Sequence, residues 1–252
     1  LYRKFRPLKF DDMVGQEHIT RTLKNQIMSG RVGHAYLFNG GRGTGKTTVS
    51  KIFARNINCL SPKDGIACQE CDSCKNSFSK DCVDIIEIDA ASNNGVDAVR
   101  SIIEASRERS IDSEYKIFII DECHMITTAG WNAFLKCIEE PSDYTIFMFC
   151  TTNPEKIPET ILNRVMRFNL TKVDTLLIRQ RLEYICYQEG YTDYAEACDF
   201  IAKLSSGGVR DAIATLEKCA NYDTDLNINN VLACVGNFSY DALFNLTGAL
   251  FN

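Results

Sequence analysis

Short apolar runs and longer stretches with helical spacing alternate along the first two thirds of the chain. The apolar runs are rich in Ile, Phe and Tyr and predict β-strands at 35–39, 83–89, 116–122, 144–152 and 166–170. Several of them are apolar throughout, which is typical of strands covered on both faces. Between the runs, apolar side chains recur every three or four residues and predict helices at 47–58, 95–109 and 131–140. The alternation predicts an α/β domain with a parallel sheet and right-handed crossovers.

The last third of the chain lacks the strand pattern. Amphipathic helical stretches are predicted at 177–188, 194–204 and 209–221, with shorter pieces at 229–234 and 240–251. Gly190 and the pair Gly207 and Gly208 separate the longer stretches, as expected of glycines that end helices. The pattern therefore predicts two domains, with the division near residue 173.

Composition is that of a globular protein without a membrane segment. Of 252 residues, 45% are hydrophobic and 24% are charged, and no apolar run approaches the roughly 20 residues that span a bilayer. The first residues do not resemble a secretory signal peptide, so a cytoplasmic location is expected. The net charge of −5 argues against a wholly basic nucleic-acid coat, but it leaves room for a local basic patch.

A glycine-rich loop follows the first predicted strand and opens the first predicted helix. It satisfies the pattern G-x-x-x-x-G-K-[ST], in which backbone N–H groups and a helix N-terminus surround phosphate oxygens. Lys46 is expected to reach the β- and γ-phosphates of a nucleoside triphosphate, and the Thr47 hydroxyl to bind Mg²⁺. A chance glycine-rich turn is the alternative, and the flanking strand and helix argue against it. The predicted phosphate-binding residues are Gly40, Gly41, Arg42, Gly43, Thr44, Gly45, Lys46, Thr47 and Thr48.

Two carboxylates end the predicted strand at 116–122. Asp121 is suited to holding Mg²⁺ through water, and Glu122 to orienting and deprotonating the attacking water in ATP hydrolysis. An ordinary acidic strand end is the alternative, and the phosphate loop makes it the weaker interpretation. The segment from Asp121 to His124 also resembles the box of DExH helicases, which require a second motor domain for which this chain has no room.

Four cysteines lie close together after the first helix, in the pattern Cys59-x8-Cys68-x2-Cys71-x2-Cys74. Four soft thiolates without histidine favour Zn²⁺ in a closed tetrahedral site, which is a structural and not a catalytic arrangement. An iron–sulfur cluster and four unlinked thiols are the alternatives. The other eight of the twelve cysteines are expected to be reduced, buried small hydrophobes, since no secretory signal accompanies them; they are Cys82, Cys123, Cys137, Cys150, Cys186, Cys198, Cys219 and Cys234.

These pieces, in this order, resemble the γ/τ subunits of the bacterial DNA polymerase III clamp loader, which are AAA+ ATPases. The resemblance extends from Tyr2 to about Gly236. Besides the loop, the carboxylates and the cysteines, it rests on the segments 2–7, 14–18, 87–96, 132–136, 162–164 and 208–212. The loop alone is unspecific, whereas loop, cysteines and the sequence Glu-Ile-Asp-Ala-Ala-Ser at 87–92 together are highly specific.

The resemblance implies a fold and a domain plan. A P-loop AAA+ domain with a three-layer αβα core, a five-stranded parallel sheet and a small zinc-knuckle insert at about 59–74 would occupy residues 1–173. An all-α helical lid domain would occupy 174–238, and 239–252 would begin a further helical domain. That third domain assembles the family's ring, so this piece alone is expected to be a monomer.

The resemblance also implies roles for matching residues. Thr152 matches the polar sensor beside the γ-phosphate, and Arg210 the second sensor on the lid. Arg164 matches the arginine that enters a neighbouring subunit's ATP site, although Asn163-Arg164-Val165 departs from the family's Ser-Arg-Cys. Cys123 stands where valine is usual and is expected to have little effect. The residues that would flank the adenine are Tyr2, Arg6, Pro7 and Val14.

The implied function is an ATP-binding and ATP-hydrolysing clamp-loader subunit of DNA-directed DNA polymerase III, a nucleotidyltransferase. Its expected partners are the other clamp-loader subunits in a hetero-oligomeric ring, the sliding clamp, and primer–template DNA held through its backbone phosphates. Arg100, Arg107 and Arg109 are expected on one helix, which either faces the DNA or is simply solvated. A nucleotide-binding scaffold without essential hydrolysis is the first alternative, and a DNA helicase motor the second.

Overall fold

The computed structural model describes residues 1–77, 82–223 and 225–236. It divides into two compact units, one of Pro7–Thr171 and the other of Leu1–Arg6 together with the residues from Lys172 onward. The helical piece predicted at 240–251 and the further domain predicted at 239–252 lie outside the described residues.

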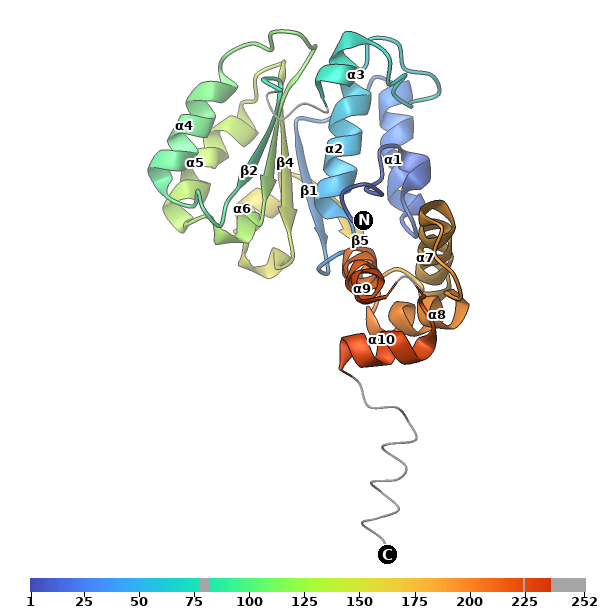
Figure 1. The fold of residues 1–252 in the computed structure, drawn as a ribbon. Coiled ribbons are helices and arrows are strands. Elements are labelled where there is room, and N and C mark those ends of the chain that lie inside the picture. The colour runs from blue at the N-terminus through green and yellow to red at the C-terminus, as the bar shows by residue number, and fades with distance from the viewer. Residues whose placement is uncertain (78–81, 224, 237–252) are drawn as a thin grey trace, which may run out of the picture. The chain divides into compact units, whose positions relative to one another are not determined.

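The first unit is built on a sheet of five parallel strands in the order β2-β3-β4-β1-β5 (Figure 1). The strands are β1 Ala35–Gly40, β2 Ile85–Asp89, β3 Lys116–Asp121, β4 Thr145–Thr151 and β5 Met166–Leu170. All five predicted strands are therefore confirmed, with ends shifted by at most two residues. In this order β1 lies between β4 and β5, so the segment after β1 starts beside the ends of both neighbours.

Helices cover both faces of this sheet. Tyr36 and Phe38 of β1 pack on the side of α1 (Glu17–Met28) and α2 (Lys46–Ile57). Leu37 of the same strand packs on the opposite side, where α4 (Val96–Ser106), α5 (Thr128–Glu139) and α6 (Glu159–Leu162) lie. Because successive side chains of a strand point to opposite faces, apolar strands of this kind hold two helix layers at once. The three-layer αβα architecture is confirmed.

Several helix ends differ from the sequence-based prediction. Helix α4 ends at Ser106, with Arg107 as its C-cap, so Arg107 and Arg109 are not on the helix as expected. The Arg109 guanidinium instead lies 5.7 Å from the Tyr144 ring, just before β4 begins. Helix α5 begins three residues early, because the Thr127 side chain accepts a hydrogen bond from the Gly130 N–H and caps it. Helix α1 was not among the predicted helices, although Ile19, Leu23 and Ile27 recur in it at helical spacing.

Short elements complete the first unit. The four-cysteine segment contains α3 (Asp72–Asn76), and three 3₁₀ turns follow or precede larger elements. They are η1 Phe10–Asp12, η2 Cys123–Met125 and η3 Pro154–Lys156. The turn η2 follows β3 directly and reverses the chain just after the two predicted catalytic carboxylates.

The regular elements in the described part of the second unit are all helices. Its helices are α7 Thr175–Glu189, α8 Ala195–Leu204, α9 Val209–Tyr222 and α10 Ile228–Val235, as the amphipathic pattern predicted within two residues. Asp174 caps α7 by accepting from the Leu176 N–H, and Gly190 ends it with a left-handed backbone at φ 73°. The first residues of the chain join this unit, where Arg181 donates to the Phe5 carbonyl oxygen at 2.9 Å. The sequence-based plan had assigned residues 1–6 to the α/β domain.

Among the described residues, no helix is both long and apolar enough to cross a membrane.

Candidate functional site

The glycine-rich loop joins β1 to the N-terminus of α2, which is the strand–loop–helix context predicted for it. Gly45 forms the N-cap of α2 with φ 103°, a backbone conformation that side chains rarely adopt. At Gly40, an added Cβ would lie 2.5 Å from the Leu170 carbonyl oxygen. Gly40 is therefore required for the close approach of the loop to β5, and Gly45 for the turn into the helix.

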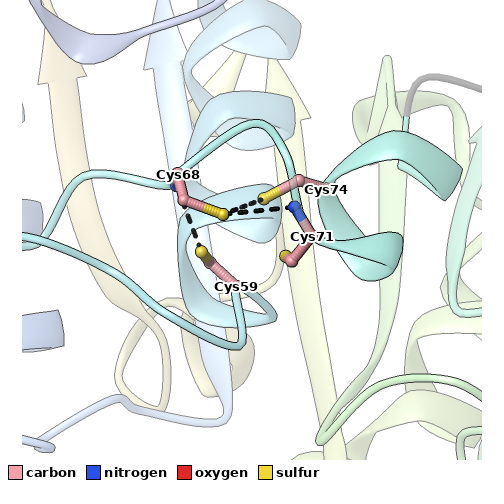
Figure 2. A group of neighbouring side chains, drawn as sticks. All are labelled: Cys59, Cys68, Cys71 and Cys74. Atoms are coloured by element: carbon pink, nitrogen blue, oxygen red, sulfur yellow. Dashed lines mark hydrogen bonds between the residues drawn. The ribbon is translucent and has the colours of Figure 1, made fainter.

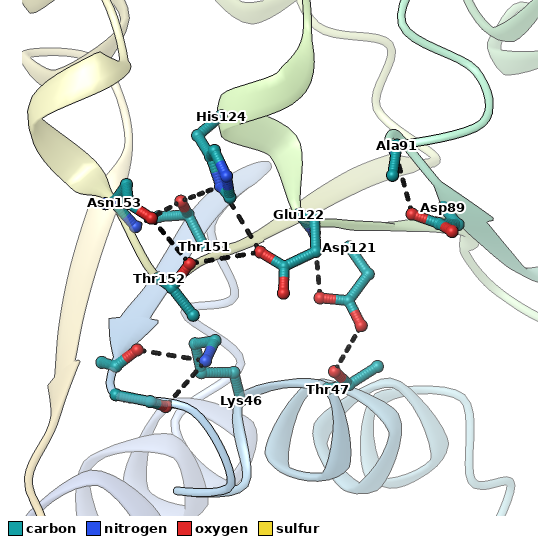
Figure 3. A network of polar contacts seen from close by, with 12 residues as sticks. Lys46, Thr47, Asp89, Ala91, Asp121, Glu122, His124, Thr151, Thr152 and Asn153 are labelled. Atoms are coloured by element: carbon teal, nitrogen blue, oxygen red, sulfur yellow. Dashed lines mark hydrogen bonds and ion pairs between the residues drawn. The ribbon is translucent and has the colours of Figure 1, made fainter.

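Lys46 is buried at the base of this loop, with a 7% exposed side chain. Its ammonium donates to the carbonyl oxygens of Gly40 at 3.1 Å and Gly41 at 2.9 Å (Figure 3). Burial lowers the pKa of Lys46, and the carboxylates of Glu122 and Asp121 act in the opposite direction. These two hydrogen bonds hold the Lys46 ammonium at the N-terminus of α2. The helix dipole makes the same end favourable for anions, so both features suit a bound phosphate.

The remaining loop residues differ in exposure. Gly41 and Arg42 are exposed at the tip, whereas Thr44 is buried and donates from Oγ1 to the Gly41 carbonyl oxygen at 2.9 Å. Gly43 has φ 75°, and Thr48 lies in the first turn of α2. The loop thus has an exposed tip at Gly41 and Arg42, while the Thr44 side chain is folded inward against the Gly41 carbonyl oxygen.

Thr47 and Asp121 meet across the end of the sheet. The Thr47 Oγ1 donates to Asp121 Oδ2 at 2.7 Å, so the hydroxyl that opens α2 contacts the carboxylate that ends β3. Hydroxyl and carboxylate oxygens are ligands that Mg²⁺ accepts readily. The pair predicted to hold magnesium is therefore brought together by the fold, and its donor set fits that ion.

Glu122 has a left-handed backbone, with φ 47° and ψ 40°. For a residue other than glycine this conformation costs on the order of 1–2 kcal/mol and is found most often at functional sites. It turns the Glu122 side chain back towards the end of β4, where Thr152 Oγ1 lies 3.4 Å from Glu122 Oε2. The predicted water-activating carboxylate and the predicted sensor are thus neighbours.

Three further polar residues that the sequence analysis did not assign complete this network. His124 Nδ1 lies 3.0 Å from Thr151 Oγ1 and 3.4 Å from Glu122 Oε2. Asn153 donates its backbone N–H to Thr151 Oγ1 at 3.0 Å, and its side-chain Oδ1 accepts from the Thr152 hydroxyl at 2.9 Å. The only sequence signal for His124 was its place in the acidic box.

The other predicted site residues are distributed over both units. Val14 and Pro7 belong to the α/β unit; the Met13 methyl carbon next to Val14 would lie 3.1 Å from a Cβ built on Gly45, so this segment borders the phosphate loop. Tyr2, Arg6 and Arg210 belong to the helical unit, in which the Arg210 guanidinium lies 5.4 Å from the Tyr2 ring centre.

Arg164 is exposed just after α6. Its guanidinium pairs with Glu139, with Nη2 at 2.7 Å from Oε1, and donates from Nη1 to the Thr160 carbonyl oxygen at 2.7 Å. Two contacts of this kind fix the direction of a long side chain that would otherwise be free to rotate.

The four cysteines form one compact cluster (Figure 2). All four Sγ atoms lie within 4.8 Å of one another, and those of Cys68 and Cys74 are 4.0 Å apart. A tetrahedral zinc with Zn–S bonds of about 2.3 Å needs sulfur–sulfur separations of about 3.8 Å, so the donor set and spacing fit Zn²⁺. Since the cluster brings four ligands together, four unlinked thiols is the weaker interpretation.

Hydrogen bonds to sulfur and burial shift the pKa values of these cysteines in different directions. N–H donors from the backbone lower the pKa of Cys68 to about 6, with those of Glu70 and Cys71 the main contributors. Burial raises the pKa of Cys59 and that of Cys74, which is fully buried. The cluster is fastened to the end of α2, where Asn56 Oδ1 accepts from the Ala67 N–H at 2.5 Å. The cysteine cluster therefore lies at the opposite end of α2 from the phosphate loop.

Of the eight other cysteines, five are buried, as expected of small hydrophobes; they are Cys123, Cys150, Cys186, Cys198 and Cys219. Cys82, Cys137 and Cys234 are only partly buried.

Comparison with known proteins gives one family and one fold. Residues 15–174 match the family described as DNA polymerase III, delta subunit. The chain is 42% identical over 237 residues to the DNA polymerase III subunit tau of Bacillus subtilis, and 36% identical over 251 residues to that of Escherichia coli. These alignments cover 94% and 99% of this chain but only 42% and 39% of the relatives, so the chain spans less than half of their length.

Solved structures of the Thermotoga maritima RuvB Holliday junction branch migration motor have a similar fold. The TM-score is 0.68 at 20% identity, over 92% of this chain and 72% of that one. Identity this low shows the fold alone, which is the P-loop AAA+ fold. Family match, relatives and fold agree, and the chain therefore belongs to the DNA polymerase III delta-subunit family and resembles its gamma/tau subunits.

Proposed function

We propose that this chain is the ATP-binding and ATP-hydrolysing part of a clamp-loader subunit of DNA polymerase III, which acts in the cytoplasm to place the sliding clamp on primed DNA. The observation that carries the proposal is the convergence of four side chains at one end of the sheet. Lys46 and Thr47 start α2, and Thr47 contacts Asp121 at 2.7 Å, one residue before Glu122. An ATP-hydrolysing site needs a cation, a metal-ligand pair and a group that orients and deprotonates water, and these four side chains would supply them.

Each residue has a separate task in this proposal. ATP would supply the phosphoryl group, and Mg²⁺ the positive charge that polarises it. Lys46 would leave the loop carbonyl oxygens to meet phosphate oxygens, while Thr47 and Asp121 hold the metal. Glu122 would orient water and take its proton, with Thr152 next to it as the sensor. Arg210 would serve as the second sensor, and Tyr2, Arg6, Pro7 and Val14 would border the adenine.

Assembly with neighbouring subunits would complete the site. Arg164 is exposed and directed by Glu139 at 2.7 Å, as an arginine that enters a neighbour's ATP site must be. A guanidinium supplied by another subunit is worth about 10³–10⁵ in rate, which would make hydrolysis depend on the ring. The partners in this proposal are the other clamp-loader subunits, the sliding clamp and primer–template DNA bound through its phosphates. The cysteine cluster would hold a structural Zn²⁺.

A Glu122→Gln variant of the full-length protein tests the catalytic role. In the reconstituted clamp-loader complex we expect ATP binding to be retained and clamp loading to be lost, because glutamine keeps the side-chain shape but cannot take a proton. Unchanged loading would favour the scaffold without essential hydrolysis. Strand displacement by the full-length wild-type protein would favour the helicase motor, for which the likeness to RuvB offers only a shared fold.

A further inference from the structure

Among the residues that the structure describes, two hydrogen-bond donors are found for the Glu122 carboxylate within 3.4 Å: the Thr152 hydroxyl and His124 Nδ1. A hydroxyl carries a single hydrogen, so Thr152 can donate to one acceptor at a time. Its shorter contact is with Asn153 Oδ1 at 2.9 Å. The orientation of that amide follows from its other end, since Asn153 Nδ2 donates to Glu155 Oε1 at 2.9 Å. Thr152 is thus engaged by Asn153, and the donor left for Glu122 is His124.

The protonation of the His124 ring follows from its surroundings. An ionised carboxylate only accepts hydrogen bonds, so a bare Nδ1 lone pair 3.4 Å from Glu122 Oε2 would be repelled. A hydrogen on Nδ1 is attracted both to Glu122 Oε2 and to Thr151 Oγ1, which lies at 3.0 Å. The carboxylate therefore selects the form with hydrogen on Nδ1.

The ring itself is held in place by buried structure. Thr151 is fully buried at the end of β4 and is fixed by the Asn153 N–H, which donates to its Oγ1 at 3.0 Å. His124 lies in the turn η2 that directly follows Glu122, and its side chain is 11% exposed. Figure 3 shows the imidazole between the Thr151 and Glu122 side chains. The end of β4 thus fixes the orientation of the His124 ring, and the ring fixes the orientation of the Glu122 carboxylate.

We propose that His124 is a positioning residue that holds the Glu122 carboxylate in the direction needed to activate water. This inference rests on the proposed hydrolytic role of Glu122 and adds to it a separate residue with a separate test. His124 does not take the proton in this scheme; it fixes the group that does. Without this donor the carboxylate would be less firmly oriented, and a misplacement of about 1 Å can cost about 10²-fold in rate.

The test uses two amide substitutions that differ only in where they place an N–H donor. In His124→Asn the amide nitrogen falls near the position of Nδ1, whereas in His124→Gln it falls nearer to Nε2. In the full-length protein within its assembled complex, we expect His124→Ala and His124→Gln to lower kcat for ATP hydrolysis about 10- to 100-fold. We expect His124→Asn to stay within about threefold of wild type. The affinity for a fluorescent ATP analogue should remain unchanged in all three variants.

A second experiment asks whether His124 acts through Glu122. If it does, the double variant Glu122→Gln, His124→Ala should hydrolyse ATP no more slowly than Glu122→Gln alone, since residues that act as a unit are not additive. Wild-type kcat in His124→Ala, equal loss in the Asn and Gln variants, or a parallel loss of nucleotide affinity would each overturn the inference. Wild-type protein without hydrolysis, or full activity in Glu122→Gln, would instead overturn the proposed function.

Discussion

Thr47 Oγ1 donates to Asp121 Oδ2 across 2.7 Å, so two residues that are 74 positions apart in the chain contact each other where α2 begins and β3 ends. Parallel strands end at the same edge of a sheet, so β1 and β3 both end here. The loop after β1 leads at this edge into α2. The fold thus brings together the two residues that are proposed to hold Mg²⁺.

Replacement of Thr47 should therefore affect the metal more than the fold. We expect Thr47→Ala to lower the rate of ATP hydrolysis by about 10²–10³-fold, because metal-assisted charge stabilisation is worth several kcal/mol. The Mg²⁺ concentration for half-maximal rate should rise. Thr47→Ser keeps the hydroxyl and is the matched control, with activity close to wild type. An equal loss in both variants would argue against a metal-ligand role.

The lowered pKa of Lys46 leads to a prediction about how stability depends on pH. Burial lowers its pKa below the 10.5 of an unfolded chain, so between the lowered value and 10.5 the unfolded state binds more protons than the folded state. The cost of the buried charge is fully present below the folded pKa and is relieved as pH rises through this window. Lys46→Met removes the charge, so without nucleotide it should be at least as stable as wild type at pH 7.

The same variant should lose its response to nucleotide. A ligand at 100 times its Kd stabilises a folded protein by about 2.7 kcal/mol, and Lys46→Met should not show this gain with MgATP in denaturant unfolding. Lys51→Met is the control on the same helix; Lys51 pairs with Glu87 at the surface, and its variant should keep the gain. A full nucleotide response in Lys46→Met would contradict the assignment of the loop.

Gly40 should be intolerant of any side chain even without nucleotide. An alanine Cβ would lie 2.5 Å from the Leu170 carbonyl oxygen and 2.9 Å from the Leu170 Cβ, and neither belongs to a movable side-chain end. We expect Gly40→Ala to lower the free energy of unfolding by about 1–3 kcal/mol, as overpacking does. At Gly95 an added Cβ meets nothing within 4 Å, so Gly95→Ala should change stability by no more than about 0.5 kcal/mol. Thermal denaturation of both variants without ATP decides the point.

The contacts at the site show how much of it could be predicted from the sequence. Apolar runs located β1 and β3, and the structure brings Thr47, which opens α2, to 2.7 Å from Asp121, which ends β3. The roles of Lys46, Thr47 and Asp121 stay predictions. The position of His124 was not predictable in this way. It depends on the left-handed backbone of Glu122 and on the turn η2, neither of which has a periodic signal.

The end of α4 and the placement of the first residues could not be predicted from hydrophobic periodicity either. Arg107 and Arg109 were expected on the helix predicted at 95–109, yet α4 closes at Arg107. The Phe5 carbonyl oxygen is fixed by Arg181, a residue 176 positions away, and no local pattern encodes that contact. Long-range hydrogen bonds of this kind determine where segments without regular structure lie.

Zinc should stabilise the protein without acting in hydrolysis. Helix α2 has 12 residues and thus extends about 18 Å, with the phosphate loop at one end and the cysteine cluster at the other. We expect one Zn²⁺ per chain, and we expect Cys71→Ser or a strong chelator to remove it and lower the melting temperature. Cys82→Ser lies outside the cluster and should keep the metal. Chelation at a temperature where the fold persists should leave at least about half of the ATPase rate, and a complete loss would indicate a catalytic role for the metal.

Arg164 should act on a neighbouring subunit and not on its own. Its guanidinium is directed by Glu139 and the Thr160 carbonyl oxygen, within hydrogen-bond reach of both. Arg164→Ala should therefore leave ATP affinity of the separate chain unchanged and lower hydrolysis by the assembled complex about 10³-fold or more. Glu139→Gln keeps the side-chain size but weakens the ion pair, and should cause a smaller loss.

Mixed complexes distinguish action between subunits from action within one. A subunit with Arg164→Ala retains its own Glu122, whereas a subunit with Glu122→Gln retains its Arg164. When the two variants alternate in one ring, an intact arginine faces an intact carboxylate at some interfaces, so part of the activity should return. If Arg164 acted within its own chain, every site of the mixture would lack one of the two groups, and the mixture would be as inactive as either variant alone.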